Sequence, residues 1–416
     1  MKKMSSVGLF LLLNSVYFFS YFQRVGIPGT IFNELQSTFS VSATTIVGLG
    51  SLTFFVYGLM QIFSGVLSDR FGGFKTFLIG AFLLSVSSIL FSFSHSVSML
   101  FTTRAIVGFS AGFIYISLIK ILTTIYPEKK FPFYLGITLV LGYSGGIFAT
   151  YPLERLVSYL GWRNSLLLIG IICSICTIIC FSVFRISGTP STKKQTFSLP
   201  LLMGVLKNTH SLPLFISSPI NFGIYFLFQS TIGKKFLQDF CAFSSSDASL
   251  FTFIMMITNT VFTFVSSYTS GLTGKRRSII TSATFITLTA LLILFFNLSF
   301  LNKKGLFLVS YILLAIGAAA GPVYTTTMKE SNAISIAATS VGLLNTITYL
   351  FIGFLGWCTG FILDHFRDAS VEKEGIIIYP PSAYRAIFLF CIILAVCSFL
   401  VSLLIKDKQQ KLCNSS

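Results

Sequence analysis

A single arginine lies inside the first apolar stretch of the chain, VYFFSYFQRVGIPG (residues 16–29). Asn14, Tyr17, Tyr21 and Arg24 follow one another at spacings of three, four and three residues, which places them on one helical face. If this stretch crosses a membrane, Arg24 lies roughly 6 Å from the middle of the span at helical rise. A charge at that depth costs at least about 2.5–3.5 kcal/mol. Arg24 is therefore expected to face a water-filled cavity or to form a structural ion pair.

The acidic residues offer no partner for Arg24 in the middle of the membrane. Of the 12 acidic residues, all but Glu154 lie in polar loops or at the ends of apolar stretches, and Glu154 lies near such an end beside Arg155. The cavity around Arg24 is therefore expected to be electropositive. A planar guanidinium suits a carboxylate or a phosphate, which predicts an anionic ligand. Glu154 remains a candidate for proton coupling.

Other apolar stretches carry polar side chains four residues apart, which share a helical face. These faces predict the far walls of the same cavity, and the alternative for each residue is a hydrogen bond between helices. Lys120 is a candidate second anion contact, although a lysine near the end of a span also reaches the lipid headgroups. Besides Arg24, Tyr17 and Tyr21, the candidate substrate-binding residues are Tyr57, Gln61, Lys120, Asn221, Tyr225, Gln229, Asn345 and Tyr349.

The composition indicates the elements that hold these residues. Hydrophobic residues make up 54% of the 416 residues and charged residues only 10%, against about 25% charged residues in a soluble domain. Twelve stretches approach the about 20 apolar residues that a membrane helix needs. They cover residues 7–32, 43–67, 76–94, 98–124, 132–158, 164–186, 209–233, 247–271, 278–297, 305–328, 336–363 and 384–406. The sequence therefore predicts an all-α membrane protein with twelve transmembrane helices.

The chain divides into two halves at the polar sequence RISGTPSTKKQTFSLP (185–200). This division predicts an N-terminal six-helix bundle, a cytoplasmic linker, a C-terminal six-helix bundle and a cytoplasmic tail, over residues 1–187, 188–208, 209–406 and 407–416. Lysine and arginine are more frequent in the loops on the side of both termini, with Lys234 and Lys235 assigned to an outer loop. Both termini are therefore expected to be cytoplasmic.

The loop after the second span carries a motif. GVLSDRFGGFK (65–75) fits the pattern G-x-x-x-D-R-x-G-x-x-K/R through Gly65, Asp69, Arg70, Gly72 and Lys75. The fourth span fits R-x-x-x-G-x-x-x-G through Arg104, Gly108 and Gly112. On these motifs the chain resembles the major facilitator superfamily over its whole length. The resemblance implies the major facilitator fold of two six-helix bundles, a cytoplasmic gate at the loop motif that latches the outward-open state, and a mainly structural arginine in the fourth span.

Two further comparisons refine this resemblance. Gly271 stands where the second half would repeat the acidic residue of the loop motif, which predicts a one-sided latch. YFQR (21–24) resembles the first-helix pattern of the organic-anion/cation symporters and organophosphate antiporters, in which an arginine near this point binds the anionic group of the substrate. Gln23 stands where proton-coupled members often carry an acid, and the seventh span lacks the second arginine of the organophosphate exchangers.

These features predict a secondary active transporter of a small organic solute, with an anion favoured, that works by alternating access and is coupled to a proton or an exchanged anion. The alternatives are efflux of amphipathic or cationic compounds, transport of a neutral solute such as an amino acid or nucleoside, and a membrane sensor or receptor. No enzyme activity, cofactor, metal or nucleic-acid partner is expected. The expected partners are the solute, the coupling ion and the lipid bilayer, for a monomer in the cytoplasmic (inner) membrane.

Overall fold

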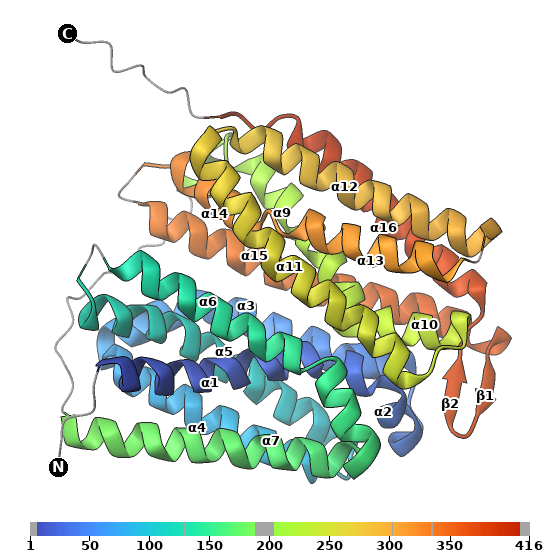
Figure 1. The fold of residues 1–416 in the computed structure, drawn as a ribbon, viewed down its shortest axis with the longest axis horizontal. Coiled ribbons are helices and arrows are strands. Elements are labelled where there is room, and N and C mark those ends of the chain that lie inside the picture. The colour runs from blue at the N-terminus through green and yellow to red at the C-terminus, as the bar shows by residue number, and fades with distance from the viewer. Residues whose placement is uncertain (1–5, 128–129, 188–203, 302, 334–335, 408–416) are drawn as a thin grey trace.

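The computed structural model describes residues 6–127, 130–187, 204–301, 303–333 and 336–407. The predicted linker (188–208) lies outside the described residues up to residue 203, and the predicted tail (407–416) lies outside them from residue 408. The described chain is mostly helical, with one two-stranded sheet (Figure 1).

The helices of the first half lie together in the lower part of Figure 1. They are α1 (Ser6–Gly26), the 3-10 turn η1 (Gly29–Ile31), α2 (Phe32–Phe39), α3 (Ala43–Phe71), α4 (Gly73–Ser92), α5 (Val97–Ile125), α6 (Phe131–Phe148) and α7 (Tyr151–Ser187). Gly161 interrupts α7 with a φ of 73°. This break falls between the fifth and sixth predicted spans.

The helices of the second half lie together in the upper part of Figure 1. They are α9 (Leu212–Leu227), the π-helical turn η2 (Phe228–Ile232), α10 (Gly233–Cys241), α11 (Ser245–Thr273), α12 (Arg276–Phe296), the π-helical turn η3 (Asn297–Leu301), α13 (Lys304–Ala318), α14 (Gly321–Glu330), α15 (Ala337–His365), the 3-10 turn η5 (Arg367–Ala369) and α16 (Pro381–Ser402). Strands β1 (Val371–Lys373) and β2 (Ile376–Ile378) form an antiparallel hairpin that was not predicted. Glu374 and Gly375, both with positive φ, make its tight turn.

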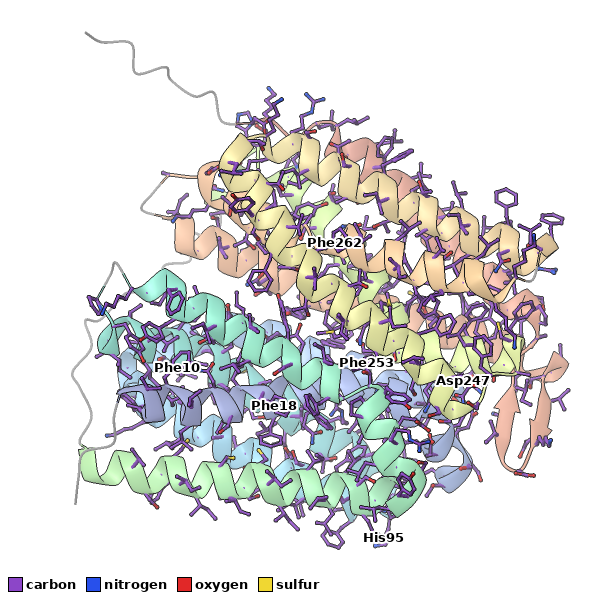
Figure 2. All side chains as sticks on the ribbon, in the orientation of Figure 1. Phe10, Phe18, His95, Asp247, Phe253 and Phe262 are labelled. Carbon is purple, nitrogen blue, oxygen red and sulfur yellow. The ribbon has the colours of Figure 1, made fainter. Side chains whose placement is uncertain are left out.

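Ten helical segments of the described chain are long and apolar enough to cross a membrane. α1, with 21 residues, and the shorter apolar helix α6 bring the number to the twelve predicted spans. Large apolar side chains such as Phe82, Ile178 and Phe262 lie exposed, where lipid would cover them. Figure 2 shows the side chains on the helices, with Phe262 labelled on α11. The predicted all-α membrane fold is confirmed.

Three spans differ in detail from the prediction. The first helix ends at Gly26, before Pro28, and the chain continues through η1 into α2. The tenth span is divided into α13 and α14, which begins at Gly321. The seventh span continues through η2 into α10, so that Lys234 and Lys235 are buried in a helix rather than exposed in an outer loop. The assignment of these two lysines to a loop was wrong because their charges have partners inside the fold.

α3 and α15 run in opposite directions along the junction of the two halves. Near one end of the pair, a Cβ atom on Gly360 would lie 2.8 Å from the Cα of Thr44. Near the middle of α3, a Cβ atom on Gly58 would lie 3.2 Å from the carbonyl oxygen of Thr346. Glycine permits this close approach because it has no side chain. The two contacts define the register of the pair from the start of α3 to its middle.

Candidate functional site

A cavity of about 470 Å³ lies between the two halves. Eight of the candidate substrate-binding residues line it: Tyr17, Tyr21, Arg24, Tyr57, Gln61, Asn221, Asn345 and Tyr349. The lining extends to Thr326 and Val341, near the end of α14 and the start of α15. These positions lie on the side of the molecule where α1 begins and α16 ends (Figure 1). We call this the terminal side, and the cavity is open toward it.

Arg24 is the only charged residue among the described residues that line the cavity. It is 3% exposed. Its guanidinium carbon lies 4.6 Å from the ring centroid of Tyr21 and 4.4 Å from that of Tyr57. Its Nε donates to the backbone oxygen of Ser20 at 3.4 Å. Among the residues that the structure describes, the guanidinium has no ion pair and no other hydrogen bond.

The aromatic contacts do not offset the burial of this charge. Two cation–π contacts contribute roughly 0.5–2 kcal/mol each, whereas taking an ion out of water costs several kcal/mol. The remaining N–H groups of Arg24 therefore need hydrogen-bond acceptors inside the cavity. Water or the anionic group of a ligand supplies them, and only the anion also neutralises the charge.

Tyrosines form much of the wall around Arg24. Tyr57 and Tyr349 meet edge to face with ring centroids 4.5 Å apart, and Tyr17 stacks on Tyr115 at 5.4 Å. Tyr115 and Tyr143 also line the cavity and were missed in the sequence. A lone tyrosine in an apolar span has no spaced polar partner, so the sequence carries no signal of the direction in which it points.

Two polar residues of α11 were also missed. Asn259 and Thr263 line the cavity and are four residues apart, so the spacing rule applied to the eighth span would have found them. Asn259 donates to the backbone oxygen of Ala315 at 3.0 Å. An N–H group of this amide therefore forms a contact between α11 and α13.

Three candidates do not line the cavity. The Lys120 ammonium donates to the backbone oxygen of Ser68 at 3.0 Å, where α5 meets α3. The Tyr225 hydroxyl is buried and donates to the sulfur of Met256 at 3.4 Å. Gln229 is buried in η2, and neither of its amide atoms has a hydrogen-bond partner among the described residues. A role in substrate binding stays a prediction for these three residues.

Contacts between the two halves close the cavity on the side opposite the terminal side. The Lys234 ammonium donates to the backbone oxygen of Thr30 at 2.5 Å, and the Asn33 amide donates to the side-chain oxygen of Gln238 at 3.1 Å. A Cβ atom on Gly29 would lie 2.5 Å from a carbonyl oxygen of η2. We call this layer the closed end.

Asp364, near the end of α15, caps α3 at the closed end. Its Oδ1 and Oδ2 accept hydrogen bonds from the backbone N–H groups of Ala43 and Thr44, both at 2.9 Å. The unpaired N–H groups and positive dipole end of a helix N-terminus favour a carboxylate. The Tyr379 hydroxyl donates to Oδ1 at 3.4 Å, and burial together with the Asp364 charge raises the pKa of this phenol well above its usual range. Asp364 thus ties α15 of the second half to α3 of the first.

Glu154, the candidate for proton coupling, lies at the closed end near the start of α7. It is 3% exposed, and its Oε2 accepts no hydrogen bond from the described residues. Its charge and that of Glu34 both act on the ammonium of Lys234, which belongs to the other half. An acid of one half therefore lies near a cation of the other, and proton coupling through Glu154 stays a prediction.

The loop motif after the second span lies on the terminal side. Gly72 has a φ of 90°, a conformation that favours glycine. Arg70 and Lys75 are exposed, and a Cβ atom on Gly65 would meet nothing within 4 Å. The side chain of Asp69 lies outside the described part of the structure. A latch at this loop stays a prediction for an outward-open conformation.

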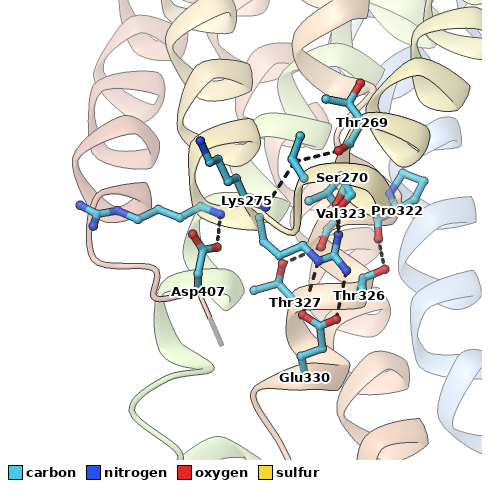
Figure 3. Close-up of polar contacts among 12 residues, drawn as sticks. Thr269, Ser270, Lys275, Pro322, Val323, Thr326, Thr327, Glu330 and Asp407 are labelled. Carbon is cyan, nitrogen blue, oxygen red and sulfur yellow. Dashed lines mark hydrogen bonds and ion pairs between the residues drawn. The ribbon is translucent and has the colours of Figure 1, made fainter. Parts of the chain in front are cut away.

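The corresponding loop of the second half holds an ion pair (Figure 3). Arg276 Nη2 lies 3.2 Å from Oε1 of Glu330, at the end of α14, and Arg276 Nη1 donates to the Ser270 hydroxyl at 2.5 Å. Glu330 of α14 thus provides a carboxylate for this loop, in which Gly271 stands at the position of the acidic residue of the loop motif. All four residues belong to the second half, so this ion pair does not join the two halves.

The arginine and glycines of the fourth-span motif lie at helix contacts. Arg104 is fully buried and donates to the backbone oxygens of Gln23 and Ile27, at 2.9 and 3.2 Å, where α1 ends. A Cβ atom on Gly108 or Gly112 would clash with α3. Arg104 therefore contacts the backbone of α1 rather than the cavity, and the two glycines let α5 lie close to α3.

Curated relatives match part of the chain. Monocarboxylate transporter 7 of Homo sapiens is 28% identical over 149 residues, which are 35% of this chain and 28% of that protein. The probable sulfoacetate transporter SauU of Cupriavidus necator is 28% identical over 159 residues, 37% of this chain and 36% of that protein. The quinolone resistance protein NorB of Staphylococcus aureus is 27% identical over 165 residues, 40% of this chain and 34% of that protein. The chain thus matches between 28% and 36% of the length of these relatives.

Solved structures match nearly the whole chain. A bacterial homolog of the human lysosomal transporter Spinster, in an inward-facing and unoccupied conformation, has a TM-score of 0.78 at 16% identity, covering 95% of this chain and 96% of that one. The nucleoside transporter NupG has a TM-score of 0.72 at 17% identity, covering 94% and 98%. A family model described as Major Facilitator Superfamily matches residues 13–356. The chain therefore belongs to the major facilitator superfamily and is a multi-pass membrane protein.

Proposed function

We propose that this protein is a transporter of a small organic monoanion and that Arg24 binds the anionic group of the substrate. The observation that carries the proposal is the charge of the central cavity. Arg24 is buried there, and no other charged residue is among the described residues of the lining. One unpaired positive charge is neutralised by one negative charge, which favours a monoanion over a dianion, a neutral solute or a cation.

The position of Arg24 also connects binding to alternating access. Tyr57 of the first half touches the guanidinium and contacts Tyr349 of the second half. A ligand held at this point contacts both halves, so it stabilises conformations in which they approach on the terminal side. No acid is among the described residues of the lining, which favours exchange of anions or electrogenic uptake over proton symport. We place the protein in a cytoplasmic membrane with cytoplasmic termini, on the charge of its loops.

The names of the relatives support an anion without deciding for it. The names of two relatives contain anions: a monocarboxylate is a monoanion, and sulfoacetate is a dianion at neutral pH. Quinolone resistance and nucleoside transport, in the names of NorB and NupG, correspond to efflux of an amphipathic compound and to transport of a neutral solute. The unpaired charge of Arg24 favours the anion among these alternatives.

The proposal is tested by thermal stabilisation of the purified protein with a panel of anionic, neutral and cationic metabolites. A ligand that binds only the folded protein stabilises it by about 2.7 kcal/mol at a hundredfold excess over Kd. Some monoanions should stabilise the wild type and lose this effect in Arg24→Gln. Arg104→Gln is the matched control, because Arg104 is equally buried but donates to the backbone of α1. That variant should be less stable yet still respond to the same anions.

The opposite pattern would overturn the proposal. Suppose that neutral or cationic metabolites stabilise the wild type and Arg24→Gln equally, and that no monoanion stabilises the wild type more than the variant. Arg24 then has a structural role. Efflux of amphipathic compounds or transport of a neutral solute would then be the better description.

A further inference from the structure

Four amide side chains line the central cavity within the described residues: Gln61, Asn221, Asn259 and Asn345. Two of them bind neighbouring helices. Asn221 and Asn259 donate to carbonyl oxygens of α13 at 2.9 and 3.0 Å, and Asn221 also accepts a hydrogen bond from a threonine of α12 at 2.6 Å. These two amides hold the second half together.

Gln61 and Asn345 have no such partners. Gln61 is 7% exposed, and its Nε2 donates to no acceptor among the described residues. Asn345 is half-buried and makes no hydrogen bond in the part of the chain that the structure describes. Buried polar groups in folded proteins are rarely left without a partner, which applies to the amide nitrogen of Gln61. Both side chains line the cavity. The contents of the cavity therefore supply what these amides lack.

The contact of α3 with α15 places the two amides at the same level. Tyr57 and Tyr349 meet across this contact at 4.5 Å. Gln61 follows Tyr57 by four residues on α3, and Asn345 precedes Tyr349 by four residues on the antiparallel α15. Both amides therefore lie on the same helix faces as the tyrosines, about 5.4 Å, or one turn, closer to the terminal side.

We propose that Gln61 and Asn345 form a neutral hydrogen-bonding subsite, which selects monoanions that also carry a hydroxyl or carbonyl group. This inference rests on the proposed anion site, since Arg24 lies over the ring of Tyr57 at 4.4 Å and fixes the anionic end of the ligand. The neutral group of the substrate then lies about one helical turn from its anionic group. Because Gln61 and Asn345 belong to different halves, a substrate that binds both amides links the two halves.

The test compares 4-hydroxybutanoate with pentanoate, which has the same shape but ends in a methyl group. Their Kd values are measured by titration calorimetry on the purified full-length protein. The wild type should bind 4-hydroxybutanoate about tenfold or more tightly than pentanoate, because the analogue leaves the amides unpaired. Gln61→Met and Asn345→Leu remove the amides at similar volume, and each should bring the ratio close to one.

The ratio of the two Kd values is taken within each variant, so a general loss of affinity for both anions cancels. Asn297→Leu is the matched control, because it removes a buried amide that lies outside the cavity lining and is bound to the backbone of Lys303. It should lower thermal stability and keep the preference for 4-hydroxybutanoate. Arg24→Gln should weaken the binding of both anions.

Three results would overturn the inference. If the wild type binds 4-hydroxybutanoate and pentanoate with equal Kd values, and Arg24→Gln binds neither, the amide subsite is ruled out and the proposed function stands. A preference for 4-hydroxybutanoate that survives in both Gln61→Met and Asn345→Leu would place the hydroxyl elsewhere. If the wild type binds neither anion but binds a neutral or cationic metabolite, the proposed function fails and the subsite with it.

Discussion

Replacing Asp364 with asparagine is expected to loosen the closed end without changing the central cavity. The carboxylate accepts hydrogen bonds from the backbone N–H groups of Ala43 and Thr44, each at 2.9 Å. Asparagine has the same shape but no charge, and only one of its two terminal atoms is an acceptor. One N–H at the start of α3 therefore loses its partner, and the charge no longer interacts with the helix dipole.

The magnitude follows from these two losses. A carboxylate at a helix N-terminus contributes about 0.3–1 kcal/mol at an exposed site and up to about 2 kcal/mol when partly buried. A hydrogen bond to a charged group contributes roughly 1.5–3 kcal/mol, against roughly 0.5–1.5 kcal/mol for a neutral one. Because these contributions overlap, we expect Asp364→Asn to weaken the closed end by about 1–3 kcal/mol. That shifts the ratio of closed to open molecules by roughly 5- to 150-fold.

The assay is a distance measurement by pulsed electron paramagnetic resonance. Spin labels at Ser37 on α2 and Glu372 on β1, both exposed, report on the two halves at the closed end. The labels are introduced after the 8 native cysteines have been replaced. The doubly labelled protein with Asp364 intact should give mainly a short distance between the labels, and Asp364→Asn should add a population with a longer distance. Asp368→Asn is the matched control, because this exposed acid makes no hydrogen bond within the described residues.

Two results would refute the reasoning. Identical distance distributions in wild type and Asp364→Asn would mean that the cap contributes nothing to the closed conformation. An equal shift in Asp368→Asn would mean that the effect arises from overall surface charge rather than from the capped helix.

Three further substitutions have definite expected outcomes. Gly29→Val should separate the two halves at the closed end, because a side chain there meets the backbone of η2; the same spin-label pair should report a longer distance, and an unchanged one would contradict the contact. Arg104→Met removes two hydrogen bonds to the end of α1 and should destabilise the protein by about 3 kcal/mol; an unchanged Tm would mean that these bonds are dispensable. Arg24→Lys keeps the charge but loses the planar donor pair, so calorimetry should show about tenfold weaker binding of the monoanion; equal affinity would mean that a point charge is enough.

The wall of the cavity that α1 and the α3–α15 pair form could be predicted from the sequence. A charged side chain in an apolar membrane helix is not expected to face lipid. The spacing of Tyr17, Tyr21 and Arg24 was therefore enough to predict which face of α1 lines the cavity. The pair Asn345 and Tyr349 followed in the same way. In the seventh span the rule did not extend to Tyr225, whose hydroxyl donates to the sulfur of Met256. It did not extend to Gln229 either, which lies in the π-helical turn η2, where an extra residue per turn changes the direction of the side chains.

Most of the closed end could not be predicted from a local pattern. Lys234 reaches Thr30, and Asp364 reaches Ala43, over more than 200 intervening residues. Lysine near the end of an apolar stretch ordinarily marks a loop. Lys235 is paired at 2.7 Å with Asp239, four residues later in the same helix, and this pair is the one part of the closed end that residue spacing could have indicated. The contacts of Lys234 and Asp364 depend on how the two halves dock, which the spacing of residues within one helix does not record.

The central claim, that the buried charge of Arg24 selects a monoanion, is tested most directly by comparing a carboxylate with its own neutral amide. The Kd values of 4-hydroxybutanoate and 4-hydroxybutanamide are measured for wild type and Arg24→Gln; the two ligands share size and hydroxyl group and differ in charge. An anion site at Arg24 predicts that the wild type binds the carboxylate about tenfold or more tightly than the amide, and that Arg24→Gln loses this preference. Equal or tighter binding of the amide by the wild type would contradict the claim.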